Sequence, residues 1–127
     1  MAAVLLVDDN GEVLDAQRAL LESAGYVVEV ATDGAEALHL LRNGFRPSVI
    51  LLDIMMPGID GFQFREMQMS IPELAPIPVI VYSGYTVDTR RLAQLRPVAF
   101  LQKPFDPERM LELIAGAARG GPAAVSH

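Results

Sequence analysis

Residues 48–62 read SVILLDIMMPGIDGF, so four apolar residues, 49–52, stand directly before the carboxylate of Asp53. A buried charge is costly unless a partner or a ligand compensates it. The N-terminus repeats the pattern, because the run VLLVDD begins at Val4 and ends on Asp8 and Asp9. Each stretch therefore indicates a buried strand that delivers carboxylates to a place where something binds them.

Short apolar runs alternate with helical patterns along the chain. The runs are rich in Val and Ile and cover residues 3–7, 27–31, 48–52, 78–83 and 98–102. Helical spacing predicts helices over 13–24, 35–41, 60–70, 87–95 and from Asp106-Pro107 to 117. Most of the runs are nearly continuous, which is typical of strands covered on both faces, whereas 27–31 contains Glu29 and suits a sheet edge. This order predicts an α/β fold with a parallel sheet.

Polar side chains follow or end four of the predicted strands. They are Asp8 and Asp9, then Asp53, Ser83 and Lys103. In parallel α/β folds the reactive crevice lies beyond the carboxyl ends of the strands. We therefore expect these five side chains to meet at one edge of the sheet.

The chemistry of this set points to phosphoryl transfer. Three carboxylates repel one another unless a cation lies among them, and oxygen ligands without His or Cys suit Mg²⁺. A carboxylate beside such a metal can attack phosphorus and form an acyl phosphate. Lys103 can neutralise one phosphoryl oxygen, the Ser83 hydroxyl can donate to another, and the small Gly84 keeps access open.

The bulk composition excludes several classes of protein. A chain of 127 residues fits one domain, and the lack of cysteine excludes disulfide frameworks and thiolate sites. Sixteen acids against ten bases give a net charge of -6, which argues against a nucleic-acid binder. The opening MAAVLLVDDN has no basic segment and only a short apolar run, so we expect a soluble, cytoplasmic protein without a membrane anchor.

The motifs LLVDDN, VILLDIMMPGIDGF, VIVYSGY and FLQKPF, in this order, resemble those of the receiver domains of two-component response regulators. The resemblance covers roughly residues 3–119. It implies a flavodoxin-like, doubly wound five-stranded parallel sheet of order 2-1-3-4-5 with helices on both faces. We expect a receiver domain over residues 1–119 and a flexible C-terminal tail over 120–127.

The resemblance also implies roles for individual residues. Asp53 is the expected phosphoacceptor. Asp9, Asp53 and the backbone carbonyl of Met55 are expected to bind Mg²⁺ (or Mn²⁺) directly, with Asp8 acting nearby through water.

Further positions match the part of the family that responds to phosphorylation. Ser83 and Lys103 are expected to contact the phosphoryl group. Ser83 and Phe100 would then form a switch, with the hydroxyl moving inward and the aromatic ring filling the vacated space. Lys103-Pro104 matches a peptide bond that is usually cis in the family.

The implied partners are proteins rather than nucleic acids or membranes. A phosphohistidine on a histidine kinase or phosphotransfer domain would supply the phosphoryl group, and a downstream effector or a hybrid-kinase parent would read the switch. A homodimer formed on phosphorylation is a further expectation. Nothing like a helix-turn-helix follows the last predicted helix, so either a stand-alone receiver or a segment of a larger protein fits.

Two departures from the family pattern carry predictions. The segment from Ser83 to Lys103 is shorter than usual and LRPVAF lacks a glycine, so the fourth helix is expected to be short, shifted or mobile. Met55 and Tyr85 are bulky residues two positions beyond Asp53 and Ser83, and we expect both to influence the rate of dephosphorylation.

Other readings of the same residues remain open at this stage. Asp8, Asp9 and Asn10 are also good helix caps. A degenerate receiver that only binds partners would need no chemistry. An aspartyl-phosphate phosphohydrolase would place a second acid where Met55 stands, and a nucleotide or flavin binder would need a glycine or serine loop where DDNGE stands. We expect a signalling switch rather than a turnover enzyme.

Overall fold

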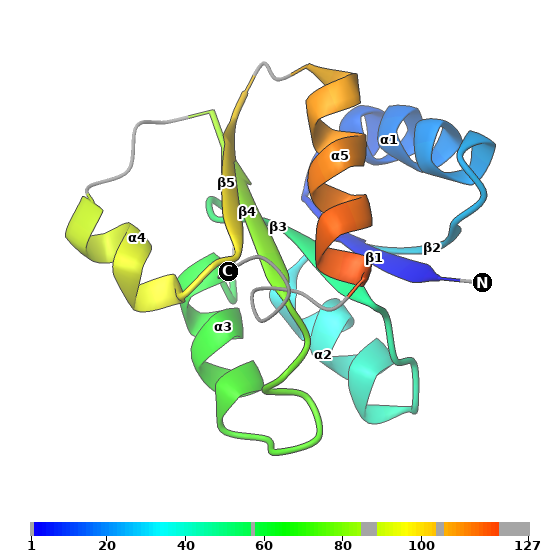
Figure 1. The fold of residues 1–127 in the computed structure, drawn as a ribbon. Coiled ribbons are helices and arrows are strands. Elements are labelled where there is room, and N and C mark those ends of the chain that lie inside the picture. The colour runs from blue at the N-terminus through cyan, green and yellow to red at the C-terminus, as the bar shows by residue number, and fades with distance from the viewer. Residues whose placement is uncertain (1, 57, 85–88, 104–105, 120–127) are drawn as a thin grey trace.

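The computed structural model describes residues 2–56, 58–84, 89–103 and 106–119. Within these residues strands and helices alternate without exception (Figure 1). Their bounds are β1 Ala3–Val7, α1 Gly11–Ser23, β2 Val27–Ala31, α2 Gly34–Arg42, β3 Val49–Asp53, α3 Gly61–Met69, β4 Val79–Ser83, α4 Thr89–Leu95, β5 Ala99–Gln102 and α5 Pro107–Ala118. The predicted succession is confirmed, and β3 extends to include Asp53 itself.

The strands form one parallel sheet of order β2-β1-β3-β4-β5, as expected. Three of the continuous apolar runs are the central strands β1, β3 and β4, and every residue of β3 and β4 is buried. The fourth, β5, lies at the sheet edge, and only Leu101 of it is buried. The run with the internal Glu29 is β2, whose residues alternate between exposed and buried at the sheet edge. The hydrophobic pattern therefore predicts the place of β2 and of the central strands, but not that of β5.

Helices cover both faces of the sheet, in two layers that Figure 1 separates clearly. On one face α1 and α5 pack through Leu14, Leu21, Met110 and Ile114. The other face is covered by α2, α3 and the end of α4, with Leu38, Phe64 and Leu95 among the buried residues. None of the helices in the described residues is both long and apolar enough to cross a membrane.

Side-chain caps begin several of these helices. The side chain of Asn10 accepts hydrogen bonds from the backbone N–H groups of Glu12 and Val13 at the start of α1. Asp106 caps α5, with Pro107 in the first turn, as the sequence predicted. Because Asn10 caps α1, the side chains of Asp8 and Asp9 are available for the sheet edge.

The fourth helix is short, as expected, with seven residues. After it Arg96 takes a left-handed backbone conformation with φ 49°, which is costly for a residue with a Cβ atom. Residues 120–127 lie outside the described residues, so the predicted flexible tail stays a prediction.

Candidate functional site

Three carboxylates meet at the carboxyl edge of the sheet. Asp8 and Asp9 follow β1, and Asp53 ends β3, which lies beside it. One oxygen from each carboxylate lies within 4.8 Å of the others. Asp8 is fully buried, Asp53 is 5% exposed and Asp9 is exposed. The sequence therefore predicted correctly that these acids come together.

Lys103 brings a positive charge to the same edge. It follows β5, and its backbone N–H donates to the carbonyl oxygen of Ser83 at 2.8 Å. Its ammonium nitrogen lies 3.1 Å from Asp8 Oδ2 and 3.4 Å from Asp53 Oδ2. Lys103 thus bridges two of the three carboxylates.

Asp8 is fixed through both of its oxygens. Oδ1 accepts a hydrogen bond from the backbone N–H of Asn10 at 2.9 Å, and Oδ2 accepts one from the Tyr82 hydroxyl at 2.6 Å. Burial alone would raise the pKa of Asp8, but the bonds from Tyr82, Asn10 and Lys103 together hold this pKa below its usual value. Asp8 is therefore a fixed negative charge at neutral pH.

Asp53 has a different electrostatic environment. Its Oδ1 accepts one hydrogen bond from the backbone N–H of Met55 at 3.1 Å. Burial raises the pKa of Asp53 to about 6; nearby Lys103 opposes this shift, while the negative charge of Asp8 adds to it. The Asp53 carboxylate is therefore more basic than that of Asp8, which suits a nucleophile.

The turn after Asp53 depends on a close backbone approach at Gly61. A Cβ atom at Gly61 would lie 2.7 Å from the Cα atom of Ile54 and 3.0 Å from the carbonyl oxygen of Asp53. The N–H of Gly61 donates to the carbonyl oxygen of Ile54 at 2.9 Å, and Asp60 caps α3 in a capping box with Gln63. This packing holds the start of α3 against the end of β3.

The donor set fits a hard divalent cation. Three carboxylates facing one ammonium leave excess negative charge, and Mg²⁺ or Mn²⁺ prefers such oxygen ligands. Asp8, Asp9 and Asp53 are the residues that could hold it. The carbonyl of Met55 as a further ligand stays a prediction, as does the role of Asp8 through water.

The predicted switch residues lie on β4, which borders β3, and on β5, the edge strand beyond it. Ser83 is buried at the end of β4, and Phe100 is half-buried on β5, where it packs against the core beside α3 and α4. Their movement on phosphorylation stays a prediction. Tyr85 and Pro104 lie outside the described residues, and so does the expected cis peptide bond.

Sequence reasoning missed Tyr82. It pairs with Asp53 in the sheet register and is fully buried, yet its hydroxyl bonds to Asp8. The available signal was a phenol directly after the aliphatic stretch VIV, one position before the strand-ending Ser83. A buried tyrosine hydroxyl needs a partner, and the strand ends were the nearest polar groups.

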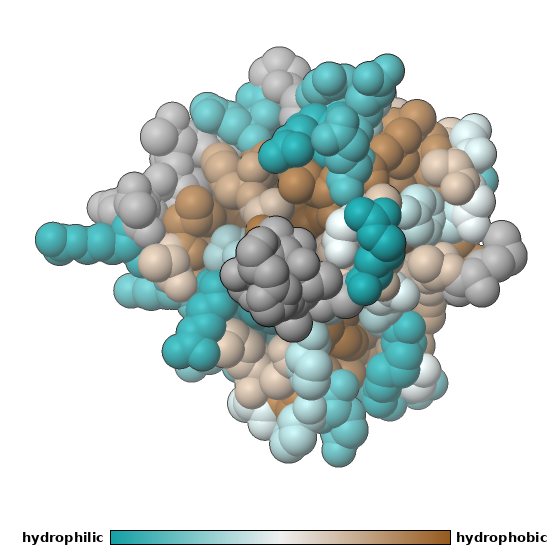
Figure 2. Space-filling view, viewed as in Figure 1, coloured by the Kyte–Doolittle hydropathy of each residue, from teal (hydrophilic) through white to brown (hydrophobic). Residues whose placement is uncertain are grey.

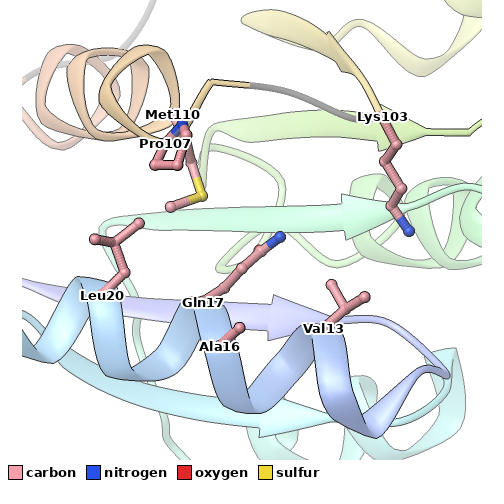
Figure 3. Close-up of a pocket in the computed structure, with 7 residues that line it drawn as sticks. All are labelled: Val13, Ala16, Gln17, Leu20, Lys103, Pro107 and Met110. Atoms are coloured by element: carbon pink, nitrogen blue, oxygen red, sulfur yellow. The ribbon is translucent and has the colours of Figure 1, made fainter.

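An apolar cavity of about 590 Å³ adjoins the site, between α1 and α5. Figure 3 shows Gln17 and Met110 pointing into it, with Lys103 on one side. Hydrophobic residues are also visible on the surface in the region of α1 and α5, at the upper right of Figure 2. Since the Lys103 stem lines this cavity while its ammonium meets the acids, the lysine belongs to both.

Comparison with known proteins places this geometry in a family. The sequence profile of the response regulator receiver domain matches residues 4–115. Protein PilH of Pseudomonas aeruginosa is 34% identical over 94% of this chain and all of its own length. The response regulator MprA of a Mycobacterium species is 38% identical over 85% of this chain, which spans only 46% of that longer protein.

Solved structures agree. The chemotaxis protein CheY4 of Vibrio cholerae superimposes with a TM-score of 0.85 at 31% identity, covering 92% of this chain and 98% of that one. The signal receiver domain of a signal transduction histidine kinase from Syntrophus aciditrophicus also gives a TM-score of 0.85, at 26% identity, covering 94% of this chain and 92% of that one. The fold is thus the flavodoxin-like one that the motifs implied, and the chain belongs to the response regulator receiver domain family.

Proposed function

We propose that this receiver accepts a phosphoryl group on Asp53 from the phosphohistidine of a histidine kinase or phosphotransfer domain. The observation that carries the proposal is the meeting of Asp53 with Lys103 and two further carboxylates at one edge of the sheet. Membership in the receiver family supports it. The proposed product is an acyl phosphate that changes how the chain contacts a partner.

In the proposed step an Asp53 carboxylate oxygen attacks phosphorus. A new O–P bond forms, the P–N bond of the phosphohistidine breaks, and the imidazole leaves with the electron pair and takes up a proton. The raised pKa of Asp53 makes its oxygen a better nucleophile, and Lys103 balances negative charge on the transferred group.

The acids around Asp53 explain why a divalent cation belongs to the proposal. When bound, Mg²⁺ (or Mn²⁺) supplies charge neutralisation at the phosphoryl oxygens. Asp9, Asp53 and the Met55 carbonyl would hold it directly, with Asp8 acting nearby through water. Asp8 suits this role because its carboxylate is already ionised and fixed.

The proposed output is a switch rather than turnover. The Ser83 hydroxyl moves toward the new phosphoryl group, and Phe100 turns into the space that it leaves. Water then attacks phosphorus, releases phosphate and restores the Asp53 carboxylate. The proposal includes a cytoplasmic location, a downstream effector or hybrid-kinase parent as partner, and a homodimer on phosphorylation.

Intact mass after incubation with acetyl phosphate and Mg²⁺ tests the proposal. The parent chain should gain one phosphoryl group, and Asp53→Asn should gain none. Removal of Mg²⁺ with a chelator should abolish the gain in the parent. A matched control, Asp15→Asn on the exposed face of α1, should label like the parent.

A short-lived adduct is covered by a second measurement, the binding of beryllofluoride with Mg²⁺ monitored by NMR. If the parent gains no mass and beryllofluoride produces no magnesium-dependent shifts, phosphoryl acceptance is wrong. The chain would then act as a receiver that only binds partners.

A further inference from the structure

Tyr82 contributes a hydrogen bond that the proposed chemistry has not used. Its ring is fully buried in β4 among aliphatic residues. Its hydroxyl donates to Asp8 Oδ2 at 2.6 Å, a length typical of a bond from a hydroxyl to a charged carboxylate. Such bonds are about twice as strong as neutral ones, so Tyr82 restrains the Asp8 carboxylate.

Tyr82 also contacts Lys103. The ammonium nitrogen of Lys103 lies 4.5 Å from the centroid of the Tyr82 ring, within the range of a cation–π interaction. The same nitrogen donates to the Asp8 oxygen that the tyrosine hydroxyl contacts. One buried side chain therefore touches both charged partners of Asp53.

This arrangement controls how Lys103 is shared between two acids. Its nitrogen lies 3.1 Å from Asp8 and 3.4 Å from Asp53. The Tyr82 hydroxyl occupies part of the acceptor capacity of Asp8 Oδ2. Without it, a fully buried carboxylate oxygen would lose its shortest hydrogen bond and draw the ammonium closer, away from Asp53.

We propose that Tyr82 is a positioning residue for phosphoryl acceptance: its hydroxyl orients Asp8, and its ring supports Lys103 so that the ammonium stays beside Asp53. The inference rests on the proposed function, because Asp53 must first be shown to accept a phosphoryl group. It gives a role to a residue of the motif VIVYSGY to which the resemblance assigned none.

The rate of phosphorylation by acetyl phosphate, at saturating Mg²⁺, tests the role of the hydroxyl. Tyr82→Phe removes only this group and keeps the ring, and it should slow the initial rate of mass gain about tenfold. Tyr82→Leu also removes the ring and should slow it further. The matched control is Tyr26→Phe, at a half-buried tyrosine before β2 at the opposite edge of the sheet; its rate should stay within about twofold of the parent.

A double-mutant cycle separates positioning from a merely structural effect. If Tyr82 acts through Asp8, then adding Tyr82→Phe to Asp8→Asn should cost much less than the tenfold that it costs alone. A general loss of stability would slow both backgrounds equally. Equal losses would therefore overturn the inference.

The position of Lys103 can be observed directly, since it is the single lysine of the sequence. Protein labelled with ¹³C at the lysine ε carbon should give one side-chain methylene signal, displaced by the Tyr82 ring. Tyr82→Leu should move the signal toward that of a free lysine, and Tyr26→Phe should not. A parent signal at the free-lysine position would overturn the ring contact.

The failures of the two proposals are distinguishable. If neither the parent nor Tyr26→Phe is phosphorylated, the proposed function is wrong and this inference falls with it. If the parent is phosphorylated and Tyr82→Phe reacts at the same rate, only the positioning role of Tyr82 is wrong.

Discussion

The described residues contain two groups of buried charge, and they are built differently. One is the acidic site at the carboxyl edge of the sheet. The other is the Arg65 cluster, formed by Arg65 and Gln68 of α3. Arg65 is 7% exposed, and it donates from Nε to the carbonyl oxygen of Leu95 at 2.7 Å and from Nη2 to that of Arg96 at 3.1 Å.

In the Arg65 cluster the chain itself supplies the partners. Arg65 Nη1 donates to the side-chain oxygen of Gln68 at 2.9 Å, and the Gln68 amide nitrogen donates to the carbonyl oxygens of Leu74 and Ile77. Burial lowers the pKa of Arg65, and the neighbouring charge of Arg96 adds to this effect. The cluster joins α3 to the end of α4 and to the turn before β4.

In the acidic site three carboxylates face one ammonium. The chain provides too little positive charge there, whereas the Arg65 cluster meets its donors with backbone carbonyls. The difference indicates that the Arg65 cluster serves the fold, and it supports the proposed cation at the acidic site.

Replacing Arg65 with methionine should lower the free energy of unfolding by about 3 kcal/mol, because it leaves buried carbonyls of the α4 end without donors. Urea unfolding measures this effect. Arg18→Met is the control, because Arg18 forms only an exposed pair with Glu22 and should cost less than about 1 kcal/mol. Mg²⁺ should not reduce the loss of unfolding free energy that Arg65→Met causes. Equal unfolding midpoints for the two variants would contradict a structural role for the Arg65 cluster.

In the metal-free protein, removing a charge from the acidic site should raise the free energy of unfolding, whereas removing Arg65 lowers it. The folded-state pKa of Asp53 is about 6, above the usual 3.8, so the folded state keeps this proton up to a higher pH than the unfolded chain does. Its contribution to stability is therefore full below pH 4 and is lost as the pH rises to about 6. As the pH rises from 4 to 7, the free energy of unfolding of Asp53→Asn should increase relative to that of the parent by on the order of 2 kcal/mol.

Urea unfolding of both proteins at a series of pH values measures this gain. The other titratable groups are common to both proteins, so the difference between the two curves reports mainly on Asp53. Millimolar Mg²⁺ at pH 7 should narrow the difference by stabilising the parent. A difference that does not change with pH would show that the acidic site carries no excess of buried charge.

The acidic site was predictable from the sequence because its logic is local. Each apolar run predicts a buried strand, and the end of the run marks the carboxyl end of that strand. A parallel sheet brings these ends together. Asp8, Asp53 and Lys103 are found this way, and so are the five strands to within one residue at either end.

The Arg65 cluster and Tyr82 were not predictable because their partners are distant in the sequence. Tyr82 meets Asp8 across 74 residues, and Arg65 meets Leu95 across 30. Such contacts depend on strand register and on the angle between helices, which no local pattern encodes. In the sequence, Arg65 is only one of the two charged residues, with Glu66, of the helix Gly61–Met69.

The smallest expected effect concerns Met55, an exposed residue whose backbone borders the acidic site. It is 55% exposed, and its N–H contacts the oxygen of the proposed nucleophile. Met55→Asn would replace an apolar side chain with an amide able to hold the attacking water. One such hydrogen bond would shorten the phosphoryl half-life about fivefold.

The half-life is measured by intact mass after acetyl phosphate is removed. Val27→Asn, at an exposed apolar residue at the start of β2, is the control. Identical half-lives for parent and Met55→Asn would mean that water reaches the phosphoryl group by another side.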